Sequence, residues 1–182
     1  METINSTSIQ ARDINNFWHC SDPFEFDALL RNSETRYKGN FSSYHGMLGY
    51  YASTGGGGRI GNQTTRFRRY PRRADSENIP HLALNDKDAN PDYLITPGMW
   101  HTIQLVAYDG LVQYLMDGRV VYEIRYGDDI KVESEKSGKK STAVITYSRE
   151  TFPAYNSGYF GIRMVASHHQ YRDLKVYRLN PK

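Results

Sequence analysis

The sequence predicts an all-β fold, in which antiparallel strands form a sandwich or a barrel. Helical periodicity is nearly absent from the 182 residues, and only 24–32 has the pattern of a short helix. Short strand-like segments recur instead, separated by Gly, Pro, Asn and Asp. Two Asp-Gly pairs, at 109–110 and 117–118, stand between apolar runs and are typical of tight β-hairpins.

The strand-like segments cover most of the chain. The expected strands are 14–20, 45–52, 64–70, 100–108, 111–117, 119–126, 142–148, 158–166 and 171–179. The two Asp-Gly turns join three of these strands, from Trp100 to Tyr126, into an antiparallel meander. The charged run 128–140 is interpreted as an exposed loop. Because no repeat or low-complexity linker divides the chain, we expect one domain spanning residues 1–182.

Composition and charge argue against several classes of partner. The net charge is only +3, and the arginines within 59–73 accompany neither a reading helix nor an aromatic RNA-binding motif. No apolar run approaches the roughly 20 residues that cross a bilayer. Residues 1–10 contain neither a basic leader nor an apolar stretch, so they are not expected to be a signal peptide. Nucleic acid and membrane are therefore not the expected partners.

Cofactor and metal sites find little support in the sequence. Cys20 is the only cysteine, which excludes an internal disulfide, and we expect it to be a buried hydrophobe beside Trp18. The glycine run 55–58 lacks the Lys-Ser/Thr of a phosphate loop and is interpreted as a flexible loop at the mouth of a site. Calcium has one weak candidate, Asp86 with Asp88, whose spacing is poor. No cofactor is expected.

One strand carries an unusual set of outward-facing side chains. In 64–70, alternation directs Phe67 toward the core and places Arg66, Arg68 and Tyr70 together on the opposite face. Arg163 occupies an equivalent outward position in 158–166. Two arginines and a tyrosine on one strand exceed what solvation requires, so this face is interpreted either as a functional surface or as a solvated one.

Four segments resemble a known family: 11–23, 61–71, 97–123 and 158–179. The last two resemble the C-terminal half of concanavalin A-like lectin/glucanase domains, with a Trp-led strand, an Asp-Gly hairpin and a closing Gly-x-x-Gly-h-R strand. Together the four resemble a bacterial family of uncharacterised jelly-roll proteins. These are related to proteins of rhamnogalacturonan and other polysaccharide-utilisation loci, and distantly to the 3-keto-disaccharide hydrolase domain. The most specific string is Asn-x-Thr-Thr-Arg-Phe-Arg-Arg-Tyr at 62–70, with Ser167-His168 near the end.

The resemblance, which covers nearly the whole chain, implies a concanavalin A-like, antiparallel two-sheet jelly-roll sandwich. It also implies a periplasmic or secreted location and a carbohydrate ligand. His169 stands where the family usually has Met. Strands usually precede the segment that starts here at Asp13, so the sandwich is expected either to lack N-terminal strands or to build that edge differently. Open sheet edges invite pairing with a second copy, so a homodimer is one expected partner state.

Two kinds of catalysis on a polysaccharide are compatible with these residues. Glycoside hydrolysis requires two facing carboxylates, and the glucanase-like string Glu25–Leu30 lacks its final Glu. β-Elimination by a lyase requires a clamp for the uronate carboxylate, a base and an acid. Arg66 and Arg68 suit the clamp, His168 suits the base or proton donor with Arg163 as its neighbour, and Tyr51 or Tyr70 is the nearby tyrosine. The candidate substrate-binding residues are Arg68, Tyr70, Tyr51, Asp13 and Asn15.

A non-catalytic carbohydrate-binding or lectin-like module is the alternative to an enzyme. It needs only an aromatic platform and converging polar groups, for which Tyr44, Tyr50, Tyr51 and Trp100 are candidates. Trp100 opens a strand and is interpreted first as a core residue. The sequence therefore leaves open whether the chain cleaves the sugar or only binds it, and the arginines favour an acidic one.

Overall fold

Antiparallel strands are the main secondary structure of the computed structural model, which describes residues 11–31, 43, 46–57, 61–70, 93–136, 139–164 and 167–180, with only the backbone over 132–136 and 139–140. A four-stranded sheet has the order β3-β2-β1-β9, with β1 Ile14–Ser21, β2 Leu48–Gly56, β3 Thr64–Tyr70 and β9 Tyr159–Arg163. A three-stranded sheet contains β4 Ile103–Tyr108, β5 Leu111–Met116 and β6 Arg119–Ile124. The remaining elements are the β7–β8 hairpin (Asp129–Lys136 and Lys139–Thr146) and the single turn α1, Ala28–Arg31.

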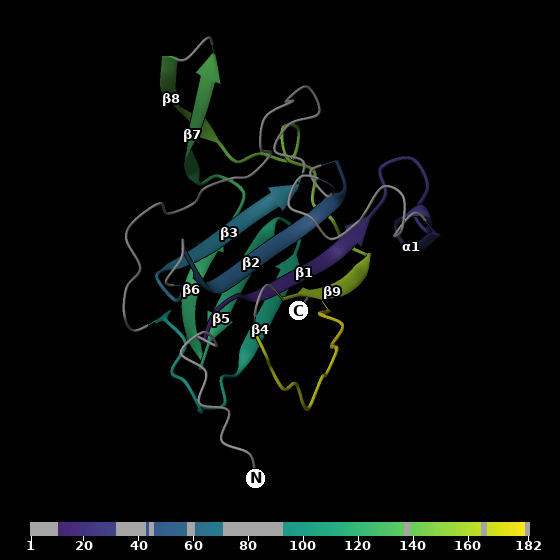
Figure 1. Ribbon diagram of the computed structural model, residues 1–182. Helices are drawn as coiled ribbons and strands as arrows, with labels where there is room; N and C mark the ends of the chain where they lie inside the picture. Colours follow the sequence, from purple (N-terminus) through teal and green to yellow (C-terminus); the bar gives the residue numbers. More distant parts are fainter. Residues whose placement is uncertain are drawn as a thin grey trace.

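The two larger sheets lie one behind the other and share a core (Figure 1). The four-stranded sheet contributes Trp18, Tyr50, Ala52 and Phe67, and the three-stranded sheet contributes Val112, Tyr114, Tyr122 and Ile124. Two hydroxyl pairs also join the sheets, Thr54 Oγ1 to Tyr114 Oη at 2.8 Å and Thr65 Oγ1 to Tyr122 Oη at 2.6 Å. The packing of Phe67 against Tyr122 confirms that Phe67 faces the core, as predicted, although Arg68 and Tyr70 on the opposite face are buried as well.

The two Asp-Gly turns confirm the predicted meander. Asp109 and Gly110 have φ angles of 43° and 85°, and Asp117 and Gly118 have 52° and 76°. Positive φ at both central residues produces the turn whose twist matches a β-hairpin, and Asp and Gly tolerate it best. These turns pair β4 with β5 and β5 with β6 in antiparallel register.

Several predicted elements are wrong. The run 128–140, expected to be a loop, contains all of β7 and the start of β8. The prediction failed because charged residues obscured the strand pattern. The segment 171–179, expected to be a strand, has no strand or helix, although its residues alternate. Gly55 and Gly56 belong to β2 rather than to a loop. The expected helix in 24–32 is reduced to α1.

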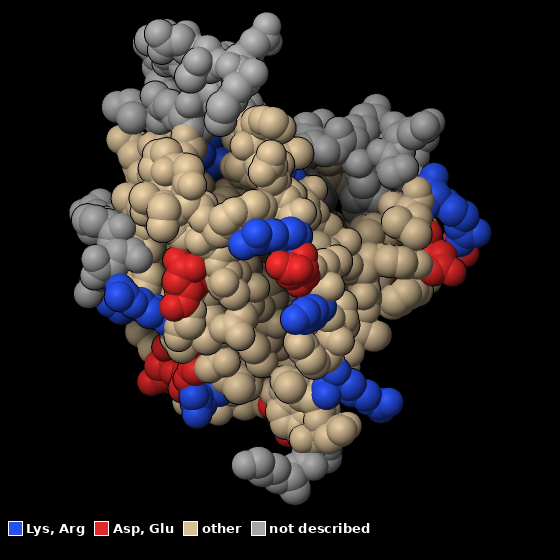
Figure 2. Space-filling model, turned by 90° about the horizontal axis from the view of Figure 1, so that it is seen from below, with Lys and Arg blue, Asp and Glu red and all other residues tan. Residues whose placement is uncertain are grey.

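Trp100 is also placed differently from its first interpretation. Its side chain is 50% exposed instead of lying in the core, and the Arg172 guanidinium lies 4.0 Å from its ring centre. This cation–π contact attaches the C-terminal segment near the start of β4. Figure 2, a view from below, shows Lys, Arg, Asp and Glu scattered over that face, without a large patch of one sign among the described residues.

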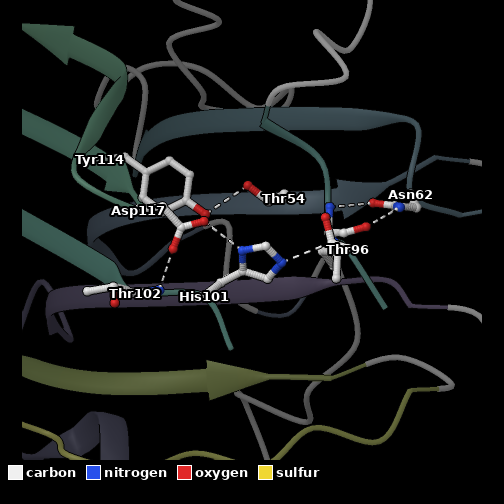
Figure 3. A network of polar contacts seen from close by, with 8 residues as sticks. Thr54, Asn62, Thr96, His101, Thr102, Tyr114 and Asp117 are labelled. Atoms are coloured by element: carbon white, nitrogen blue, oxygen red, sulfur yellow. Dashed lines mark hydrogen bonds and ion pairs between the residues drawn. The ribbon is translucent and has the colours of Figure 1, made fainter. Parts of the chain in front are cut away.

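A polar network fastens the segment before β4 to the second Asp-Gly turn (Figure 3). The Thr96 N–H donates to His101 Nε2 at 2.9 Å, so the other ring nitrogen, Nδ1, carries the proton and donates to Asp117 Oδ2 at 2.7 Å. The Thr102 N–H donates to Asp117 Oδ1 at 2.8 Å. The Asn62 side chain holds both backbone groups of Ile95: its Nδ2 donates to the Ile95 carbonyl at 2.8 Å, and its Oδ1 accepts from the Ile95 N–H at 2.9 Å.

In urea denaturation, Asp117→Ala is expected to lower the free energy of unfolding by about 1 kcal/mol more than Asp109→Ala does. Both substitutions place alanine at positive φ before a glycine, but Asp109 forms only an exposed ion pair with Arg149. Burial opposes the charge of Asp117, yet hydrogen bonds from His101 and Thr102 hold its pKa below the usual value. Such a carboxyl stabilises the fold above its unfolded-state pKa and loses that contribution as pH falls through its folded-state pKa. The difference in stability between the two variants should therefore shrink below about pH 4. Equal free energies of unfolding at neutral pH would contradict a stabilising role for the hydrogen bonds of Asp117.

Candidate functional site

The outward face of the four-stranded sheet contains a polar row that crosses every strand. Register places Arg66 of β3 opposite Ser53 of β2, Ser53 opposite Asn15 of β1, and Asn15 opposite Arg163 of β9. Directly opposed residues share one face of a sheet. We call these four residues the polar row. An arginine therefore stands at each end, with a hydroxyl and an amide between them.

A second row lies beside the polar row on the same face. It runs from Arg68 through Tyr51 and Phe17 to Gly161. A methyl group added to Gly161 would meet no other atom within 4 Å, so the face is open at this position. Tyr70 follows Arg68 along β3 and is fully buried.

Asn15 connects three strands and is only 1% exposed. Its Oδ1 accepts a hydrogen bond from the Tyr51 hydroxyl at 2.6 Å. Its Nδ2 donates to the Asp13 carbonyl at 3.1 Å and to the Arg163 carbonyl at 3.0 Å. Asn15 therefore fixes the position of β9, and of Arg163, relative to β1 and β2.

Arg68 and Arg163 act electrostatically on the same two phenols. The Arg68 guanidinium lies 5.3 Å from the centre of the Tyr51 ring and donates to the Tyr70 hydroxyl at 3.3 Å. Burial raises the pKa of Tyr51, and burial raises that of Tyr70 to about 12, although the charges of Arg68 and Arg163 oppose both shifts. Both phenols are therefore protonated at neutral pH, and the proton of Tyr51 is engaged in the hydrogen bond to Asn15 Oδ1.

Asp13 borders the polar row beside Arg66. It has a φ of 61°, its backbone N–H donates to the Gly55 carbonyl, and its carboxylate forms a 2.7 Å ion pair with Arg12. A methyl group added to Gly56 would lie 3.9 Å from Asp13 Oδ1 and 4.0 Å from Arg66 Nε. The Asp13 and Arg66 side chains therefore both border Gly56.

An apolar cluster includes the two central residues of the second row. Phe17, Cys20, Met47, Tyr51 and Tyr70 pack together. The ring centres of Phe17 and Tyr51 are 4.7 Å apart. Cys20 is buried, as expected, and burial raises its pKa to about 12, so it is an inert thiol.

The structure gathers seven of the eight predicted site residues on one sheet face. Those brought to the one face are Asp13, Asn15, Tyr51, Arg66, Arg68, Tyr70 and Arg163. His168 is exposed in the segment after β9, and no hydrogen bond or ion pair in the described part of the chain joins it to this face. The predicted Tyr44, Asp86 and Asp88 lie outside the described residues. Ser53 and Phe17 were missed, although alternation in β1 and β2 indicates both positions.

This arrangement is suited to anionic ligands. Guanidinium groups bind carboxylates with two parallel hydrogen bonds, and Arg66 is exposed and Arg163 half-buried, whereas Ser53 and Asn15 between them are buried. Among the described residues, no group of three or more His, Cys, Asp or Glu is placed to hold a metal ion. None of the described helices has the length and apolar character needed to cross a membrane.

Comparison with known proteins gives one match. The model of a family described as a domain of unknown function (DUF6250) matches residues 4–133, so the chain belongs to this family. The matched range contains β1 to β6, and therefore most of the outward face, whereas Arg163 and His168 lie beyond it. Neither a curated protein nor a solved structure matches the chain.

Proposed function

We propose that this DUF6250 chain binds an acidic oligosaccharide or polysaccharide on the outward face of the β3-β2-β1-β9 sheet. The observation that carries the proposal is the polar row, which places Arg66 and Arg163 at either end of Ser53 and Asn15. Arg68 adds a third guanidinium beside the row. Uronate carboxylates would bind the exposed Arg66 and the half-buried Arg163, while the buried Ser53, Asn15 and Tyr51 hold these arginines in place from within the sheet.

The fold that we propose for this function is a concanavalin A-like jelly roll. Two antiparallel sheets with a shared core support it, together with the Trp-led hairpin and the closing Gly-x-x-Gly-h-R strand. The resemblance to proteins of polysaccharide-utilisation loci supports a role in an exported bacterial system that degrades polysaccharides. In this proposal the ligand lies across the strands, along the polar row.

Isothermal titration with oligogalacturonate tests this proposal. Arg66→Ala and Arg163→Ala are each expected to weaken binding by about tenfold to a hundredfold, because each removes a charge-assisted hydrogen bond. Arg149→Ala is the matched control, since Arg149 is exposed and pairs with Asp109 in the β4–β5 turn. Carboxyl-reduced oligosaccharide should bind at least about tenfold more weakly than the acidic form. Unchanged affinity in both row variants, with several acidic sugars tested, would reject the site.

Catalysis by β-elimination is the second candidate, favoured by the two protonated phenols beside the arginines. In that reaction a base removes the C5 proton, the C4–O bond breaks, a C4=C5 double bond forms, and the leaving oxygen takes a proton. The arginines stabilise the charge on the uronate, and the leaving oxygen takes its proton from Tyr51 or Tyr70, whose buried hydroxyls the substrate has to reach. The base is His168, which has to move toward this face from its exposed position.

Absorbance of the unsaturated product separates this candidate from binding alone. A lyase is expected to produce a rise in ultraviolet absorbance that His168→Ala abolishes while leaving binding intact. The matched control is His169→Ala, the neighbouring histidine, which hydrogen-bonds Tyr171. Binding without absorbance, on every acidic polymer tried, would leave the chain as a binding module. Reducing ends released without absorbance would instead indicate a hydrolase, for which Asp13 is the one carboxylate at the row among the described residues.

A further inference from the structure

In the part of the chain that the structure describes, no strand pairs with the outer edge of β9, and one face of this strand has exposed apolar side chains. β9 is the last strand in the order β3-β2-β1-β9, so only its side toward β1 forms a ladder in the described chain (Figure 1). Phe160, Ile162 and Met164 alternate along the strand and are 44%, 41% and 50% exposed. These side chains lie on the face that the sheet turns toward the core, since Ile162 is opposite the inward-facing Asn16.

Two buried donors lie on the same inward face of the neighbouring strand. Asn16 and Trp18 are 4% exposed, and neither Asn16 Nδ2 nor Trp18 Nε1 has a hydrogen-bond partner among the described residues. Unsatisfied buried donors are uncommon in native proteins. Of the two, Asn16 lies directly beside β9, opposite Ile162.

The sequence of β9 is self-complementary in an antiparallel pair. If two copies pair about a two-fold axis through Gly161, Phe160 of each copy faces Ile162 of the other, and Tyr159 faces Arg163. Aromatic and β-branched residues form favourable cross-strand pairs, and no like charges face each other. The Tyr159 hydroxyl donates to Asp27 Oδ1 at 2.6 Å, so each incoming Arg163 would also meet a carboxylate.

We infer that two copies of this chain associate through β9, joining their four-stranded sheets into one. The pairing covers Phe160 and Ile162 of both copies and places Tyr159 of one copy at the end of the other copy's polar row, beside Arg163. The two outward faces then form one continuous surface. This inference rests on the sheet edge and does not depend on the proposed ligand.

Sedimentation equilibrium tests the association. The wild-type chain is expected to reach twice its mass of 21.0 kDa as concentration rises. Ile162→Lys is expected to weaken association by roughly a hundredfold, because two ammonium groups would be buried without partners. Val144→Lys, at a 62% exposed apolar residue of β8, is the matched control and should associate like the wild type. A wild-type monomer at every concentration would overturn the inference.

A cross-link keeps the inference testable if Ile162→Lys does not fold. Gly161 has free space where a Cβ would stand, so Gly161→Cys should be tolerated, and the axis places the two new thiols opposite each other. Mild oxidation is expected to give a covalent dimer of Gly161→Cys and none of Val144→Cys; the native Cys20 is buried. Failure of Gly161→Cys to cross-link faster than Val144→Cys would exclude pairing at this register.

Discussion

Phe67→Ala is expected to lower the free energy of unfolding by about 3–5 kcal/mol. Phe67 is 3% exposed and packs between the sheets, with its ring centre 5.8 Å from that of Tyr122 and 6.1 Å from that of Trp18. Removing the ring leaves a cavity that rigid strands on both sides cannot close. Urea denaturation followed by tryptophan fluorescence measures the loss, since Trp18 adjoins the cavity.

Val144→Ala is the control for this measurement. Val144 is 62% exposed on β8, so its truncation is expected to change the free energy of unfolding by no more than about 0.5 kcal/mol. A Phe67→Ala protein as stable as the control would mean that the two sheets do not share the core described here. That result would also remove the basis for the predicted facing of Arg66 and Arg68.

Asn15→Ala is expected to cost about 2–4 kcal/mol of stability and to abolish measurable oligosaccharide binding. The substitution deprives the buried Tyr51 hydroxyl of its acceptor and leaves the carbonyls of Asp13 and Arg163 without this donor. Because Asn15 joins β1 to both of its neighbours, the loss should also release Arg163 from the polar row. Thermal or urea unfolding measures the first effect, and calorimetric titration of the still-folded protein measures the second.

Asn16→Ala is the matched control for Asn15→Ala. Asn16 is the next residue of the same strand and is 4% exposed, but its Nδ2 has no hydrogen-bond partner among the described residues. It faces the core side, so its replacement should change stability less and leave binding intact. Equal effects of the two substitutions on stability and binding would show that any disturbance of β1 has these consequences. The hydrogen bonds of Asn15 would then not be their cause.

Alternation and turn chemistry predicted most of the fold. The Asp-Gly pairs fixed the meander of β4, β5 and β6, and Phe67 fixed the facing of β3, because these signals are local. The prediction failed at β7, where charged residues hid a strand, and at 171–179, where alternation exists without a partner strand. A segment becomes a strand only when it pairs with a neighbouring strand. The period of its sequence shows which side chains share a face, but not which strand it pairs with.

The site was predicted in its residue types but not in its arrangement. Outward-facing positions of single strands identified Arg66, Arg68 and Arg163. The polar row, with Ser53 opposite both Arg66 and Asn15, depends on strand order and register, which the sequence does not specify. His168 was included through the resemblance, and the structure shows it exposed after β9, outside any strand.

Amide chemical-shift perturbation tests the central claim most directly, because it shows where a ligand binds. On addition of an acidic oligosaccharide, we predict shifts concentrated in β1, β2, β3 and β9, including the amides of Ser53, Asn15, Arg66 and Arg163. The amides of β5 and β6 should remain unchanged, and Arg66→Ala should suppress the response. Binding that instead perturbs β5 and β6, with the polar row unaffected, would contradict the account.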